Sequence, residues 1–164
     1  MAEVMIRDWQ PCDLAVLHEI NEASVPGVGT TTREAHDRLV SQISAATLVA
    51  VMGDRPVGFV LCLLDGQDYA SLNYKWVSAG YDTFAYIDRV AVAPEMRGQK
   101  VGEGLYAAAF SRFAGRRKVL LAEVNLAPPN PGSLRFHKRL EFREVGERWD
   151  DGREKGVVYL ERKL

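Results

Sequence analysis

The feature that most constrains the fold of this chain is a strand, a helix and a second strand in close succession in its second half. Residues 84–92 are rich in β-branched and aromatic side chains, and an apolar stripe with helical spacing follows over residues 101–113, ending at Gly115. Residues 119–124 then form a nearly continuous apolar run, which is typical of a strand covered on both faces. This succession predicts two parallel strands joined by a right-handed crossover helix.

The segments on either side of this unit predict a mixed α/β chain of the α+β class. We expect a central, mostly antiparallel sheet of about seven strands with about four helices, in which only the strand–helix–strand unit is parallel. The other predicted elements are a strand at 4–9, a helix from Pro11 to about Asn21, a helix capped by Thr30, Thr31 or Thr32, a hairpin of 47–52 with 57–64, a short helix at 131–140, and strands at 142–149 and 156–162.

Residues 65–82 have too little apolar periodicity for a firm structural prediction, and we interpret them as a long functional loop. Tyr74 and Trp76 in this stretch, together with Asn21 and Glu22 after the first helix, are the candidates for a substrate pocket. The alternative is that these aromatic side chains pack over the core or form a subunit contact.

Composition limits the classes of protein to which this chain can belong. Its 164 residues, with 47% hydrophobic and 26% charged side chains, fit one compact domain over residues 1–164, and no repeat or linker indicates a second one. The 21 basic and 22 acidic residues give no positive field for binding a nucleic acid.

Cysteine usage and hydropathy bear on metal binding and location. Cys12 and Cys62 lie far apart, without a histidine cluster or a close cysteine pair, so neither a metal site nor a disulfide framework is expected. The longest apolar run, at residues 57–64, is too short to span a membrane, and no signal peptide is apparent at the start. These observations favour a cytoplasmic protein with reduced thiols.

The junction between the strand at 84–92 and the helix that follows it is a candidate anion site. Gly98 and Gly102 lie where the chain turns from the strand into the helix, and such a turn directs unpaired backbone N–H groups and the positive end of the helix toward one point. The alternative is a tight turn in which the glycines only allow the backbone to bend.

This junction resembles motif A of the GCN5-related N-acetyltransferases (GNAT), R/Q-x-x-G-x-G/A, which binds the pyrophosphate of acetyl-CoA. Arg97, Gly98 and Gly102 match in register, while Lys100 stands at a glycine position. Residues 130–142 resemble a second element of the family, N-x-x-A-x-x-F-Y-x-K-x-G-F. The resemblance implies a GNAT-like fold and acetyl-CoA as co-substrate, without a metal. The positions implied for binding it are Val90, Ala91, Val92, Arg97, Gly98, Gln99, Lys100, Val101, Gly102, Asn130 and Ser133.

The resemblance also implies a reaction, in which a substrate amine attacks the acetyl thioester directly. Glu123 is the expected general base, because a carboxylate within an apolar strand has its pKa raised by desolvation. The alternative for Glu123 is that it turns outward or pairs with a neighbouring arginine. Asp88 is the second candidate base, and its alternative is an ion pair with a nearby basic side chain. His137 stands at the family's tyrosine position and is the candidate proton donor to the thiolate, unless it is a packed core residue. Asn130 could bind the cofactor, cap the helix after it, or do both.

The sequence therefore predicts an N-acetyltransferase that acts on a small-molecule amine, an amino acid or a peptide. A homodimer is consistent with the family, and the acyl group could be larger than acetyl. The alternative from another class is a non-catalytic acyl-CoA sensor or interaction module, which the departures at Lys100 and His137 would suit.

Overall fold

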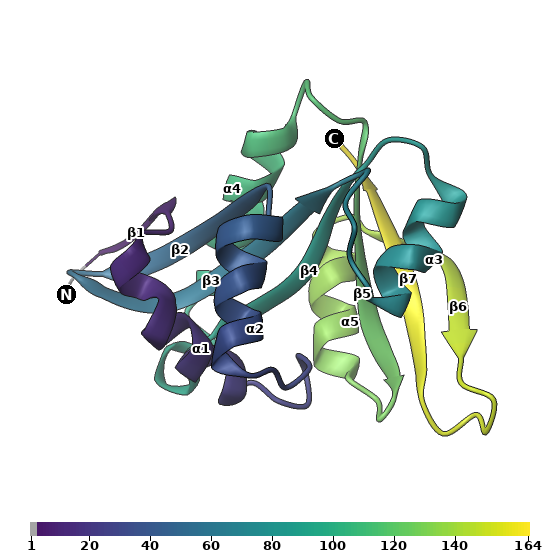
Figure 1. Ribbon diagram of the computed structural model, residues 1–164, viewed down its shortest axis with the longest axis horizontal. Helices are drawn as coiled ribbons and strands as arrows, with labels where there is room; N and C mark the ends of the chain where they lie inside the picture. Colours follow the sequence, from purple (N-terminus) through teal and green to yellow (C-terminus); the bar gives the residue numbers. More distant parts are fainter. Residues whose placement is uncertain (1–2) are drawn as a thin grey trace.

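The computed structural model describes residues 3–164 as one seven-stranded sheet with helices on both faces (Figure 1). The strand order is β1-β2-β3-β4-β5-β7-β6, and every neighbouring pair is antiparallel except β4 and β5. The strands are β1 (Val4–Asp8), β2 (Ala46–Met52), β3 (Arg55–Leu64), β4 (Ala85–Val92), β5 (Val119–Ala127), β6 (Arg143–Trp149) and β7 (Gly156–Lys163). The α-helices are α1 (Leu14–Glu22), α2 (Arg33–Arg38), α3 (Leu72–Gly80), α4 (Val101–Phe113) and α5 (Pro131–Arg139).

The predicted fold class and the parallel unit are confirmed. The crossover helix between the two parallel strands is α4, and its Leu105, Ala109 and Phe113 are buried against the sheet as their helical spacing requires. Helices α1 and α3 and the helical segment Leu39–Ile43 after α2 contribute to the core on the opposite face, where Leu17, Val40 and other apolar side chains pack on the strands. The sheet is therefore the middle one of three layers (Figure 1).

The expectation that residues 65–82 form a loop is wrong, because α3 occupies Leu72–Gly80. Ser71 starts the helix, since its side-chain oxygen accepts a hydrogen bond from the backbone N–H of Tyr74. Tyr74 and Val77 are the helix residues that become buried. A helix of nine residues with two buried positions has little periodicity, so its stability comes from contacts that are distant in the sequence.

The parallel strands β4 and β5 separate soon after they meet. Their register contains only Ala85 opposite Leu120 and Tyr86 opposite Leu121, although both strands continue for several residues beyond. The shift in register between β3 and β4 falls at Asp88, which is an extra residue on β4. From this bulge onward β4 and β5 diverge, as Figure 1 shows, and the backbone of each strand has no neighbour on that side.

Helix α3 is held against the β6–β7 hairpin by an aromatic stack. The Trp76 indole lies flat on the Tyr159 ring, with 3.9 Å between centroids and 6° between planes. Gly146 makes this possible, because a Cβ at that position would lie 2.5 Å from Cζ2 of Trp76. The missing side chain of Gly146 thus provides the space that the indole occupies.

We predict that Gly146→Ala lowers the free energy of unfolding by about 1–3 kcal/mol, because the new methyl group overlaps the indole and forces α3 away from the hairpin. Chemical denaturation measures the change. Gly80→Ala is the matched control, since a Cβ there meets nothing within 4 Å. Equal stability of the two variants would show that the stack does not constrain α3.

Helix α5 ends in a turn that normally requires glycine. The N–H of Phe142 donates to the carbonyl of His137 at 3.1 Å and the N–H of Glu141 donates to that of Lys138 at 3.0 Å, which are the two bonds of a Schellman motif. Glu141 occupies the left-handed position of this motif with φ of 69°. It also stands where the family element has a glycine, so a side chain is held in a conformation that disfavours it.

We predict that Glu141→Gly raises the free energy of unfolding by about 1 kcal/mol, because glycine adopts positive φ without the steric cost. Glu141→Ala keeps the Cβ and should change stability by only a few tenths of a kcal/mol, which separates backbone strain from loss of the carboxylate. Denaturant titration of the three proteins decides the matter. A stabilised Ala variant would attribute the gain to the charge instead.

Candidate active site

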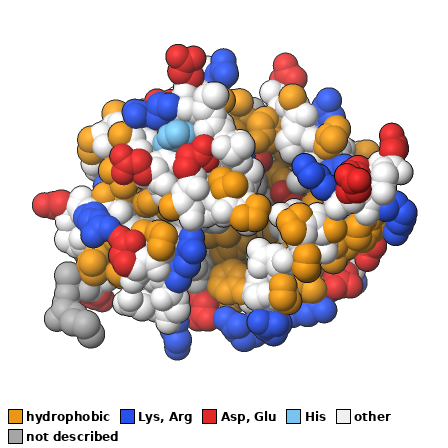
Figure 2. Space-filling model, turned by 90° about the horizontal axis from the view of Figure 1, so that it is seen from below, with side chains coloured by type: hydrophobic (Ala, Val, Ile, Leu, Met, Phe, Trp, Pro, Cys, Tyr) orange, Lys and Arg blue, Asp and Glu red, His pale blue; other side chains and the backbone are white. Residues whose placement is uncertain are grey.

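The diverging strands open a cleft of about 1220 Å³ that runs between the two halves of the molecule. Figure 2 looks into this hollow from the side on which β4 and β5 separate, and apolar side chains are visible inside it. Its walls come from β4, β5, the start of α4, α5, the loop between α1 and α2, and the β6–β7 hairpin. One end therefore meets the α4 turn, and the other meets the hairpin.

The α4 end of the cleft presents free backbone donors. Lys100 is the N-cap residue, with φ of 63°, and no side chain in the described range 3–164 forms a capping hydrogen bond there. The first intrahelical bond runs from the N–H of Gly104 to the carbonyl of Lys100, so the N–H groups of residues 101–103 have no partner in the helix. Gly98 and Gly102 line the cleft here, whereas Gln99, Lys100 and Val101 are not part of the lining. This end has the geometry for an anion.

Arg97 lines the same end of the cleft, and its guanidinium connects the two walls. It donates to the carbonyls of Val92 at 3.3 Å and Ala23 at 3.2 Å, and to Oγ of Ser24 at 3.3 Å. The loop between α1 and α2 is thereby fastened to the end of β4. Val90, Ala91 and Val92, the expected backbone contacts for the cofactor, also line the cleft.

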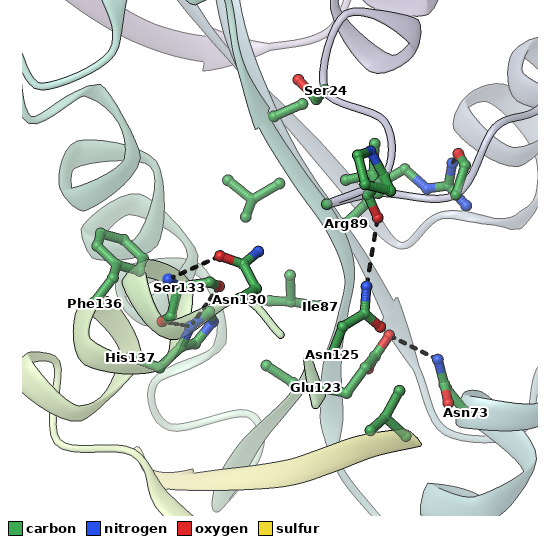
Figure 3. A pocket seen from close by; sticks show the side chains of 18 of the residues that line it. Ser24, Asn73, Ile87, Arg89, Glu123, Asn125, Asn130, Ser133, Phe136 and His137 are labelled. Carbon is green, nitrogen blue, oxygen red and sulfur yellow. Dashed lines mark hydrogen bonds between the residues drawn. The ribbon is translucent and has the colours of Figure 1, made fainter. Parts of the chain in front are cut away.

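The residues expected on α5 form a connected group (Figure 3). Asn130 caps the helix, since its Oδ1 accepts from the N–H of Ser133 at 3.3 Å. His137 is buried, and its Nδ1 lies 2.8 Å from the carbonyl oxygen of Ser133, which can only accept, so Nδ1 carries the proton. Nε2 must then accept from the Tyr106 hydroxyl at 2.5 Å. Burial lowers the pKa of His137, so its ring is neutral and has no proton directed into the cleft.

Glu123 lies near the middle of the cleft, on the part of β5 that has separated from β4. Its Oε1 accepts from the Tyr86 hydroxyl at 2.9 Å. The same oxygen accepts from Nδ2 of Asn73 at 3.2 Å (Figure 3). Its Oε2 is buried and has no hydrogen-bond partner among residues 3–164. Burial, followed by the charge of Asp88, raises the pKa of Glu123 to about 8, although both hydrogen bonds oppose the shift. A carboxyl group of this kind can exchange a proton near neutral pH.

Asp88 lines the cleft but is already paired, because the Nε of Arg89 lies 2.7 Å from its Oδ2. Arg89 also donates to Oδ1 of Asn21 at 3.1 Å, and Asn21 in turn donates to the carbonyl of Gly29 at 3.2 Å. Glu22 accepts from the Thr30 hydroxyl at 2.7 Å. Asn21 and Glu22 therefore hold the loop between α1 and α2 and are not part of the cleft lining.

The two aromatic residues expected in a substrate pocket also lie outside the cleft lining. Tyr74 is buried and donates its hydroxyl proton to the carbonyl of Leu64 at 2.6 Å, and Trp76 is stacked on Tyr159. Their neighbours Leu72 and Asn73 line the cleft in their place. The helical geometry of α3 turns one side toward the core and the other toward the cleft, which a loop interpretation could not predict.

Four polar residues of the cleft and its floor were not singled out from the sequence. Tyr86 holds Glu123, and Tyr106 holds His137, at sequence separations of 37 and 31 residues. Asn73 and Arg148 are joined by a hydrogen bond of 2.9 Å across 75 residues. Of the four, only Tyr86 could have been suspected from its local sequence, because it shares a strand with the candidate Asp88. The positions of the other three relative to the cleft depend on contacts between distant segments.

Within residues 3–164, no three histidine, cysteine, aspartate or glutamate side chains gather in a way that could hold a metal ion, and both cysteines are free. No helix in the same range combines the length and apolar character needed to cross a membrane.

Comparison with known sequences gives one family and two partial relatives. The profile of the Acetyltransferase (GNAT) family matches residues 9–142. An N-acetyltransferase of Streptomyces griseus is 35% identical over 88 residues, which are 54% of this chain and 44% of that protein. A phosphinothricin N-acetyltransferase of Streptomyces coelicolor is 38% identical over 79 residues, 46% of each protein. The matches thus span less than half the length of both relatives.

Several solved structures share the fold at low sequence identity. Arabidopsis thaliana NAA60 in complex with a bisubstrate analogue has a TM-score of 0.77 at 19% identity, covering 98% of each chain. The ribosomal-protein-S18-alanine N-acetyltransferase of Escherichia coli has a TM-score of 0.76 at 13% identity, covering 99% of this chain and 94% of that one. Ard1 of Thermoplasma volcanium has a TM-score of 0.78 at 19% identity, covering 98% and 97%.

Proposed function

The chain belongs to the acetyltransferase (GNAT) family, and from this premise we propose that it transfers an acetyl group from acetyl-CoA to the primary amine of a small molecule, amino acid or peptide. The observation that carries the proposal is Glu123, whose buried Oε2 has no partner in the described part of the chain and whose pKa is raised to about 8. Its place in the cleft, between an anion-binding helix end and an open hairpin end, suits a proton acceptor for the incoming amine.

The donor end of the cleft fits the chemistry of acetyl-CoA. The uncapped N–H groups of residues 101–103 suit the diphosphate, because they combine free donors with the positive end of α4. Val90, Ala91 and Val92 have no β5 neighbour, so their cleft-side backbone groups can bond the pantetheine arm. When bound there, acetyl-CoA supplies a thioester carbonyl carbon for the amine to attack.

In this proposal Glu123 removes the proton that the amine must lose. Asp88 is the weaker candidate base, because its carboxylate is occupied by Arg89 at 2.7 Å. One proton leaves the nitrogen and one is needed by the departing thiolate, so the reaction requires no net proton. His137 acts here as a positioning residue, since its Nε2 fixes the Tyr106 hydroxyl beside the cleft.

We predict that acetyl-CoA at about 100 times its Kd adds about 2.7 kcal/mol of stability and raises the Tm by at least about 5 °C. A panel of amines should then release free CoA. A Tm that does not move at millimolar acetyl-CoA would contradict the proposal. A raised Tm with no turnover of any amine would favour the alternative, a non-catalytic acyl-CoA sensor.

We predict that Glu123→Gln lowers kcat by about 10²–10⁴-fold, because the amide cannot accept the proton. The carboxylate is the active form and predominates above its pKa, so kcat/KM of the unmodified enzyme should rise with pH, reach half of its limiting value near pH 8 and level off above that pH. This limb should be absent in the variant, as measured by initial rates from pH 6 to 10.

Two controls separate Glu123 from other effects. The pH profile contains the ionisation of the acceptor amine as well as that of Glu123. Measuring it with two acceptors of different amine pKa separates the two, because only the inflection caused by the amine shifts when the acceptor is changed. Glu144→Gln is the matched variant, since Glu144 is exposed and pairs with Lys138 at 3.4 Å outside the cleft. An unchanged pH profile in Glu123→Gln would remove Glu123 from the mechanism.

A further inference from the structure

We propose that Arg148 binds the carboxylate of the acceptor, so that the preferred acceptor is a free α-amino acid rather than a peptide N-terminus or a simple amine. The inference rests on the proposed acetyltransferase function and names the substrate class for the same cleft. It starts from a guanidinium that lies in the lining of the cleft without an acidic partner among residues 3–164.

The sheet places Arg148 on the same face as Glu123. Glu123 on β5 is opposite Tyr159 on β7, and Arg148 on β6 is opposite Val157, two residues before Tyr159 on that strand. Side chains two apart on a strand project from the same face, and so do directly opposed residues. The carboxyl group and the guanidinium therefore project from one face at the hairpin end of the cleft.

The guanidinium of Arg148 is held in a fixed orientation by neutral groups. Its Nε donates to the Tyr159 hydroxyl at 3.0 Å and its Nη2 donates to Oδ1 of Asn73 at 2.9 Å. The Tyr159 hydroxyl itself donates to the same Oδ1 at 2.9 Å. Nη1 makes no hydrogen bond within the described part of the chain, which leaves donors and a full positive charge for a ligand.

Asn73 sets the spacing between the cation and the proton acceptor. Its Nδ2 donates to Oε1 of Glu123 at 3.2 Å, while its Oδ1 accepts from Arg148. One primary amide therefore separates the two charged groups. An α-amino acid carries its amine and its carboxylate on one carbon, so it can present both groups across a gap of this size.

The acidic residues near this end have other partners: Asp88 is paired with Arg89, and Oδ1 of Asp150 accepts from the N–H of Glu154 in the hairpin turn at 2.8 Å. Lys155, exposed at the rim, is a second cation. Leu72, with 62% of its surface exposed, adjoins Asn73 and offers an apolar contact for the acceptor's side chain. A peptide N-terminus has a neutral amide where the free acid has its carboxylate, and would leave the guanidinium without an anion.

The test compares the twenty common amino acids with their carboxamides and with dipeptides, using acetyl-CoA and measuring free CoA. We expect kcat/KM for the preferred free acid to exceed that for its carboxamide by at least about 100-fold, as for a lost charge-assisted contact. Arg148→Gln should lower kcat/KM for the acid by a similar factor and leave the carboxamide rate within about 3-fold. Arg148→Lys should recover part of the loss, because it keeps the charge but not the fork geometry.

The carboxamide serves as an internal control, since a merely misfolded variant would lose both substrates together. Arg143→Gln is the matched variant on the same strand; Arg143 pairs with Glu161 at 2.9 Å outside the cleft and should leave the acid-to-amide ratio unchanged. Equal or better turnover of carboxamides or dipeptides would overturn the assignment of Arg148 while leaving the acetyltransferase function intact. Failure to acetylate any amine would overturn both.

Discussion

The separation of β4 and β5 after two paired positions is the constraint on which the rest of the structure depends. In a continuous sheet the two strands would satisfy each other's backbone groups, and Glu123 would be covered by neighbouring chain. The bulge at Asp88 interrupts the register on the β3 side of β4 where the strands begin to part. Within residues 3–164, the result is a cleft with backbone groups on its walls that pair with no neighbouring strand and a carboxyl oxygen in its floor that has no partner. Such groups cost stability, and they are retained at the place where a ligand can satisfy them.

The electrostatics of the cleft depend on how its charges are kept apart. Arg89 pairs with Asp88, while Glu123 is held by a phenol and an amide and forms no ion pair with any residue from 3 to 164. Burial can therefore move its pKa into the range useful for proton transfer. The same amide, from Asn73, orients Arg148 on its other side. A neutral side chain thus holds one acidic and one basic group in place without letting them form an ion pair.

The sequence predicted those parts of the fold that depend on residues close together in the chain. The apolar stripe of α4, the glycines at its start and the continuous run of β5 identified the parallel unit, and the apolar context of Glu123 indicated the direction of its pKa shift. Helix α3 was missed because its stability depends on the stack of Trp76 on Tyr159, far along the chain. Arg148 and Asn73 were missed for the same reason. His137 was located correctly in α5, but the hydrogen bond from Tyr106 that determines its protonation could not be read from neighbouring residues.

The absence of a side chain at Gly146 has a consequence for how this protein could change its specificity. The indole of Trp76 fills that space, so α3, which carries Asn73, and the β6–β7 hairpin, which carries Arg148, pack together as one structural unit. A hairpin taken from a relative with a larger residue in place of Gly146 would displace α3. The side-chain amide of Asn73 would then move out of line with Glu123 and Arg148. Exchange of acceptor recognition between relatives therefore requires both pieces to be transplanted together, whereas the α4 end, which shares no contact with this stack, can remain as it is.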